Sequence, residues 1–65
     1  MIFVNGREAA EFIGANVLEM LDKGGFKLAR IAVELNGEIL PKSKYGETKL
    51  ADGDLVEIVN FVAGG

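Results

Sequence analysis

The residues of this chain best suited to covalent chemistry are two glycines, Gly64 and Gly65, which follow Val62 and Ala63. Glycine has no side chain to shield its carbonyl group, and its backbone is freer than that of any other residue. We therefore expect a thin, flexible tail from about residue 62 that enters a narrow site on another protein. The Gly65 carboxylate would react, and Gly64 would give flexibility and access. An expression scar or a frayed end is the alternative.

The sequence offers few candidates for other chemistry. The chain has no His and no Cys, and its hydroxyl groups are those of Ser43, Tyr45 and Thr48. Asp52 and Asp54 could form an acidic pair, but Asp-Gly-Asp is ordinary turn chemistry and no third ligand is near in sequence. We expect no catalytic side chain, no metal and no bound cofactor, so the protein would be a co-substrate of enzymes and not an enzyme.

Composition predicts a single domain over residues 1–65, with 49% hydrophobic residues to build a core without disulfides. The net charge is −3, and the Lys and Arg residues are scattered. This argues against nucleic acid as a partner and favours a protein that is basic at the contact surface. Because no signal peptide or long apolar segment is recognisable, we expect a cytoplasmic protein that does not contact a membrane.

The first half of the chain predicts a hairpin and then a helix. Residues 1–5 and 7–12 form the expected strands, joined at Asn5-Gly6, a pair typical of tight type I′ turns. Asn16 is the expected helix N-cap, with Glu19 placed to complete a capping box. Gly24 is the expected left-handed helix stop.

The second half predicts three more strands. Residues 30–35 alternate apolar and polar, and a second Asn-Gly turn at 36–37 leads into a short strand at 38–40. Residues 42–50 are polar and irregular, and the last strand runs from Leu55 to about Val62. This order predicts an α+β protein of the β-grasp, or ubiquitin-like, class. A mixed five-stranded sheet would pack on one main helix, with the first and last strands parallel at its centre.

The last strand carries apolar residues on both faces. Val56 and Ile58 alternate with an outer set in which Val59 and Phe61 are the candidates for an exposed patch that docks partners. Val62 and Ala63 continue from it toward the glycines and complete the expected partner-binding segment. The alternative is that the outer residues only cover the second face of the sheet.

Two segments resemble the bacterial thiamine-biosynthesis sulfur carriers, the ThiS family. They are Asn-Gly-Glu-Ile-Leu-Pro at 36–41 and Asp-Gly-Asp-Leu-Val-Glu-Ile-Val at 52–59, and the Gly64-Gly65 end and the length agree. Two departures keep the physical role: Asn16 stands where Thr or Ser is usual, and Tyr45 where another aromatic residue, often Trp, is usual.

The resemblance implies a reaction cycle. A ThiF-like adenylating enzyme would use Mg-ATP to adenylate the Gly65 carboxylate, and sulfur from a persulfide donor would displace AMP to give a thiocarboxylate. A ThiG-like thiazole synthase would then receive the sulfur. Three other functions stay open from the residues: a sulfur carrier for molybdopterin or another metabolite such as cysteine, a ubiquitin-like protein modifier, and a simple interaction module.

Overall fold

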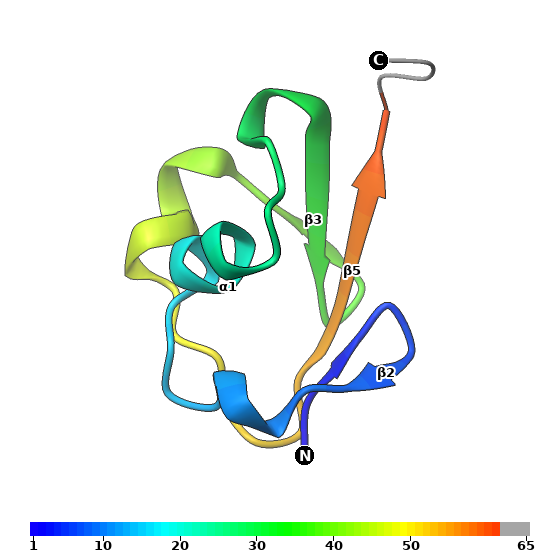
Figure 1. The fold of residues 1–65 in the computed structure, drawn as a ribbon, viewed down its shortest axis with the longest axis vertical. Coiled ribbons are helices and arrows are strands. Elements are labelled where there is room, and N and C mark those ends of the chain that lie inside the picture. Colours follow the sequence, from blue (N-terminus) through cyan, green and yellow to red (C-terminus); the bar gives the residue numbers. More distant parts are fainter. Residues whose placement is uncertain (62–65) are drawn as a thin grey trace.

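The computed structural model describes residues 1–61, and in them a five-stranded mixed sheet packs against one α-helix (Figure 1). The strand order is β2-β1-β5-β3-β4, so the last strand lies in the middle. Strand β5 runs parallel to β1 and antiparallel to β3, which confirms the predicted architecture. The strands are β1 (Phe3–Val4), β2 (Arg7–Glu8), β3 (Ile31–Leu35), β4 (Glu38–Leu40) and β5 (Leu55–Asn60).

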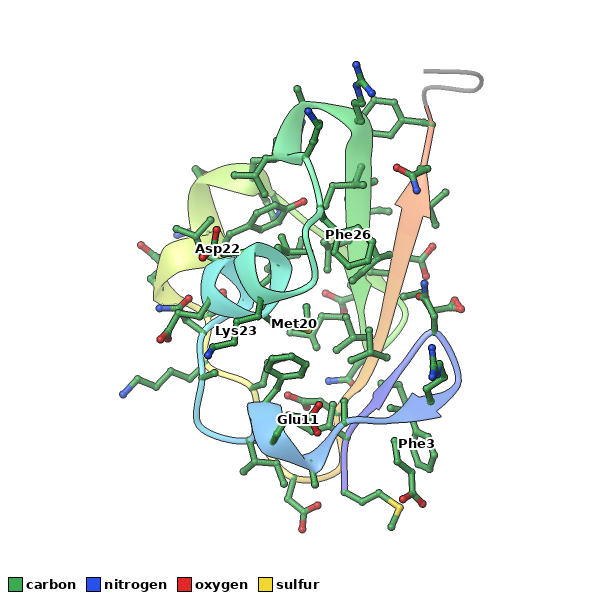
Figure 2. The ribbon with its side chains drawn as sticks, viewed as in Figure 1. Phe3, Glu11, Met20, Asp22, Lys23 and Phe26 are labelled. Atoms are coloured by element: carbon green, nitrogen blue, oxygen red, sulfur yellow. The ribbon has the colours of Figure 1, made fainter. Side chains whose placement is uncertain are left out.

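The helical elements lie on one side of this sheet (Figure 1). They are α1 (Val17–Lys23) and three 3-10 helices, η1 (Ala10–Phe12), η2 (Leu28–Arg30) and η3 (Lys42–Glu47). The core fills the space between them and the sheet, and Figure 2 shows Met20, which belongs to it, and Phe26, which packs against it. Its buried side chains are those of Ile2, Val17, Met20, Leu21, Ile31, Val33, Tyr45, Leu50, Val56 and Ile58.

Both Asn-Gly pairs form the tight turns that the sequence predicts. Asn5 and Gly6 have φ of 51° and 81°, and Asn36 and Gly37 have φ of 54° and 86°. A type I′ turn requires positive φ at both central residues, which Asn and Gly adopt at low cost. The two hairpins therefore follow from local chemistry.

The start of α1 is confirmed and its end is corrected. The Glu19 backbone N–H donates to Asn16 Oδ1 at 2.8 Å, and the Asn16 N–H donates to Glu19 Oε1 at 3.1 Å, which completes the capping box. The predicted left-handed stop at Gly24 is wrong, because Gly24 has φ of −80° and the left-handed residue is Gly25, with φ of 76°.

A Schellman motif explains this shift of one residue. The Phe26 N–H donates to the carbonyl of Leu21, and the Gly25 N–H donates to that of Asp22, each at 3.1 Å. In this motif the left-handed residue is the one after the helix cap. The motif also turns the Phe26 ring back over the helix end, where a Cβ on Gly24 would lie 2.7 Å from it.

The second predicted strand, residues 7–12, is too long. Strand β2 ends at Glu8, and η1 replaces its second half. The Ala9 N–H donates to the Ile2 carbonyl at 2.8 Å, and the next carbonyl, that of Met1, accepts from the Gly53 N–H at 2.9 Å instead of from this strand. The chain instead coils so that Phe12 packs against the core and the next turn reaches α1.

Two other boundaries differ from the predicted ones. Strand β3 begins at Ile31 because η2 occupies residues 28–30. Most of the segment expected to be irregular, residues 42–50, forms η3, and Tyr45 anchors it with an exposed fraction of 1%. Strand β5 ends at Asn60, and the predicted last residue of that strand, Val62, lies outside the described residues.

Candidate functional site

Strand β5 has one buried face and one open face. Val56 and Ile58 point toward α1 and are 1% and 7% exposed. On the opposite face Leu55 and Val59 are 56% and 50% exposed, and Phe61, the residue just after the strand, is 56% exposed. Large apolar side chains left open together on one side of a sheet are typical of a protein–protein contact. The structure thus leaves Val59 and Phe61 free to serve as the predicted docking residues.

Phe61, the last described residue, is held by two other parts of the chain. Its backbone N–H donates to the Arg30 carbonyl at 3.0 Å, which extends the pairing of β5 with β3 by one step. The Lys42 Nζ atom lies 5.7 Å from the centre of the Phe61 ring, within the range of a cation–π contact. The chain therefore leaves residue 61 from a fixed position at one end of the sheet.

Val62, Ala63, Gly64 and Gly65 lie outside the described residues. The expected reacting group, the Gly65 carboxylate, and the flexible tail therefore stay predictions. What the structure supplies is the strand that leads to them.

Asn5 fixes the direction of β5 through its side chain. The Ile58 N–H donates to Asn5 Oδ1 at 2.7 Å, and Asn5 Nδ2 donates to the Ile58 carbonyl at 3.2 Å. The backbone of β1 pairs with β5 only as far as Val56, where the Asn5 N–H donates to the Val56 carbonyl at 2.9 Å. The Asn5 amide thus replaces the next peptide group of β1 after the chain turns away at Gly6.

The Asn36 side chain forms hydrogen bonds at the start of β5, as the Asn5 side chain does further along the strand. The Leu55 N–H donates to Asn36 Oδ1 at 2.9 Å, while Asn36 Nδ2 donates to Asp54 Oδ1 at 3.0 Å. Both turn asparagines therefore hold the central strand. The Asn-Gly pattern predicts only the turns; the signal for this second role was Asn instead of Asp at both positions, because only an amide both donates and accepts.

The aspartates at 52 and 54 form a turn. Asp54 Oδ2 accepts from the Ala51 N–H at 2.8 Å, Gly53 has φ of 98°, and Asp52 pairs with the ammonium group of Met1. Among residues 1–61 no three acidic side chains gather in a way that could hold a metal ion. Over the same range no helix is long and apolar enough to cross a membrane.

Tyr45 is an ionisable side chain in the core, with an exposed fraction of 1%. Burial raises the pKa of its phenol, and the backbone of Val33 partly offsets this effect. Its ring belongs to the core cluster that α1 and the sheet enclose. Tyr45 therefore has a structural role, as an aromatic anchor for η3.

A mixed sheet with β5 at its centre and one covering helix defines the β-grasp class of ubiquitin-like proteins. The ThiS family model matches residues 2–65, and the chain belongs to the ThiS family. The resemblance of residues 36–41 and 52–59 to that family is thereby confirmed.

Named relatives agree with this membership. The chain is 35% identical to the sulfur carrier protein ThiS of Thermus thermophilus over the full length of both chains. It is 51% identical to the sulfur carrier protein ThiS of Bacillus subtilis over 35 residues, 54% of this chain and 53% of that protein. It is 39% identical to a thiazole synthase of Paramagnetospirillum magneticum over 64 residues, 98% of this chain, but spans only 20% of that relative's length.

A solved structure supports the same conclusion. The crystal structure of the thiamine biosynthesis protein ThiS from Geobacter metallireducens matches with a TM-score of 0.79 and 34% identity. The match covers 98% of this chain and 97% of that one. The two structures therefore share the whole β-grasp fold.

Proposed function

We propose that this protein is a sulfur carrier in thiamine biosynthesis that brings sulfur to the enzyme forming the thiazole ring. The observation that carries the proposal is the ThiS family match over residues 2–65. The full-length similarity to a protein named sulfur carrier ThiS supports it, as does the similarity to a thiazole synthase. The protein would act in the cytoplasm as a co-substrate, without catalytic side chains of its own.

The chemistry would take place at the Gly65 carboxylate. A carboxylate resists nucleophilic attack because its leaving group would be an oxide, so it must first be activated. A ThiF-like enzyme would use Mg-ATP: the carboxylate oxygen attacks the α-phosphate, pyrophosphate leaves and an acyl-adenylate forms. A persulfide sulfur then attacks the carbonyl carbon and AMP leaves. The C–S bond formed in this step gives an acyl disulfide; a thiol then attacks the donor's sulfur, the persulfide's original S–S bond breaks, and a thiocarboxylate and a disulfide are left.

The geometry of β5 supports this use of the tail. The strand is the central one of the sheet, and both its edges are hydrogen-bonded, to β1 and to β3. The four residues from 62 to 65 would reach about 13–14 Å if extended. A rigid strand followed by a thin tail would let a partner hold the body of the carrier while the last carbonyl group enters its active site.

Val59 and Phe61 would form the docking surface for the adenylating enzyme and for the thiazole synthase. Both are half exposed; Val59 lies on the open face of β5 near its tail end, and Phe61 directly follows the strand. Val62 and Ala63 would continue the contact into the enzyme's channel. Gly64, which has no side chain, would let the tail pass through that channel where it is narrow. Apolar contacts of this kind contribute affinity, whereas Gly65 contributes the reacting atoms.

Reconstituted thiazole formation tests the proposal. The reaction contains the carrier, a ThiF-like enzyme, Mg-ATP, a persulfide donor and a ThiG-like synthase with its other substrates. We expect product with the intact carrier and none when Gly65 is deleted. The terminal carboxylate would then belong to Gly64 and would lie one residue short of the reacting position. Product that persists without Gly65, or sulfur delivered only to a molybdopterin synthase subunit, would overturn the proposal.

A pair of substitutions tests the docking surface. Val59→Ser should raise the KM for the carrier about tenfold, because it removes an apolar contact at the tail end of β5. Ile13→Ser is the matched control, since Ile13 is 44% exposed but follows η1 on the helix side of the sheet. Equal effects of the two substitutions would show that Val59 has no special contact.

A further inference from the structure

The open face of the sheet has a second feature, far from the tail. A hollow of about 390 Å³ lies between the two hairpin turns, and we call it the distal hollow. Its lining includes Phe3, Gly6, Glu34, Gly37, Leu55 and Glu57. Leu55 is six residues before Phe61, so the hollow lies about 20 Å along β5 from the start of the tail.

The floor of the distal hollow is apolar and open. Phe3 and Leu55 are direct neighbours across the parallel pair β1–β5, and Figure 2 shows Phe3 on the side of the sheet away from α1. Leu55 is 56% exposed although it is a large aliphatic residue within a strand. None of the helical elements described for residues 1–61 covers this face, which leaves it available to another protein.

Two carboxylates stand in the distal hollow. Glu34 and Glu57 are direct cross-strand neighbours of the antiparallel pair β3–β5, so their Cβ atoms lie about 5 Å apart. Like charges in this arrangement are destabilising. Neither makes an ion pair within residues 1–61, where the salt bridges are Lys44–Glu47 and that of Met1 with Asp52.

The ionisable side chains that share the open face with this pair have the same sign; Arg7, which follows Gly6, pairs with Val4 and so falls on the other face of β2. The strand register places Glu8 across from Phe3 and Ile39 across from Glu34, on the same open face. Every ionisable side chain at an outward-facing position of the five strands is therefore acidic. A lysine at position 34 or 57 would make the protein more stable, because it would replace a like-charge pair by an ion pair. The shape and the negative charge of the distal hollow therefore fit a cationic group of another protein.

We propose that the distal hollow receives an arginine side chain of the adenylating enzyme, with apolar side chains around it that cover Phe3 and Leu55. This proposal rests on the proposed function, because the partner is the enzyme that activates the tail. A planar guanidinium has five donors for two carboxylates and apolar faces for the surrounding side chains. The two carboxylates make the hollow complementary in charge to such a cationic side chain of the enzyme.

Two points of contact on one strand would set the register of the complex. The distal hollow would hold one end of β5 while Val59 and Phe61 hold the other, so the tail would enter the enzyme from a fixed direction. Charged pairs of this kind contribute specificity and rate of association, and they lose strength as salt rises. The effect should therefore appear in the KM of the carrier and not in the kcat of the adenylated complex.

The test uses the full chain with Glu34→Gln and Glu57→Gln combined, which preserves shape and removes both charges. The matched control is Glu11→Gln with Asp22→Asn, since these exposed residues lie on η1 and α1, on the helix side of the sheet (Figure 2). ATP–pyrophosphate exchange with the adenylating enzyme gives kcat and KM for each carrier at low and high salt.

We expect the double Glu variant to raise KM about tenfold at low salt with kcat unchanged, and to lose most of the salt dependence of the wild-type protein. The control should stay within about twofold of wild type. The double Glu variant should also unfold at the same or a higher denaturant concentration than wild type, because a like-charge pair has been removed. A loss of binding without a loss of stability separates a contact from a folding defect.

Three outcomes would overturn the proposal. They are an unchanged KM of the double Glu variant, an equal loss in the control, and normal adenylation with loss only at the thiazole synthase. Failure of the proposed function has a different signature, since reconstituted thiazole formation with the wild-type carrier would then give no product.

Discussion

Replacing Asn5 by Gly should destabilise the protein through the loss of two hydrogen bonds. Gly keeps the positive φ that the turn needs, so the hairpin geometry is preserved. The change removes the bonds from the Ile58 N–H to Oδ1 and from Nδ2 to the Ile58 carbonyl, which are 2.7 and 3.2 Å long and partly buried. The result isolates the contribution of the side-chain amide that extends β1.

The expected cost is about 2 kcal/mol. A hydrogen bond contributes about 0.5–1.5 kcal/mol net, so two contribute about 1–3 kcal/mol. A 65-residue domain has a free energy of unfolding of roughly 3–10 kcal/mol on the usual per-residue scale, so this is a large fraction. With a urea dependence of about 1 kcal/mol per molar, the unfolding midpoint should fall by about 2 M.

Asn36→Gly is the matched control for this prediction. It removes the same amide from the same type of turn, but its bonds to Leu55 and Asp54 are exposed, and water replaces them. Its cost should stay below about 1 kcal/mol. Urea denaturation followed by circular dichroism measures both variants. The reasoning is refuted if Asn5→Gly shifts the midpoint by less than about 0.5 M, or if the two substitutions cost the same.

Three further predictions concern the helix and the core. Asn16→Ala should cost about 1 kcal/mol in urea denaturation because it breaks the capping box, whereas Asn16→Ser should cost little. Gly25→Ala should cost about 1 kcal/mol because φ is 76° with open space around the position, and Gly25→Asn should cost less; equal costs would argue against backbone strain. Burial raises the pKa of Tyr45, so the folded state holds the phenolic proton more tightly than the unfolded state. The free energy of unfolding should therefore fall as pH rises above about 10, the ordinary tyrosine pKa, by more than in Tyr45→Phe; parallel pH profiles would contradict this.

The parts of the fold that sequence predicted are those fixed by neighbouring residues. The Asn-Gly turns and the Asn16–Glu19 capping box involve residues at most three apart, and each of these sequence patterns favours one local backbone conformation. The alternation of Val56 and Ile58 with Val59 and Phe61 assigned the two faces of β5 for the same reason. Strand β4 was also predicted with its observed bounds, since the Asn36-Gly37 turn and Pro41 limit it.

The parts that sequence missed depend on contacts between distant residues. Strand β2 stops at Glu8 because the Met1 carbonyl, the next one beyond Ile2, is taken by the Gly53 N–H, which the residues from 7 to 12 do not reveal. The bond between Asn5 and Ile58 and the juxtaposition of Glu34 with Glu57 depend on the strand register. Register follows from the assembled sheet, and a slip of either strand by one residue would have turned its glutamate toward the buried face.

The central claim, that Gly65 carries sulfur, is tested most directly by the intact mass of the protein. The full chain is incubated with a ThiF-like enzyme, Mg-ATP and a persulfide donor, then reduced with a thiol, and fragmentation locates any change. We predict a mass gain equal to the exchange of one oxygen for one sulfur, confined to Gly65 and absent without ATP. An unchanged mass, with the enzyme shown to be active on a known carrier, would contradict the account.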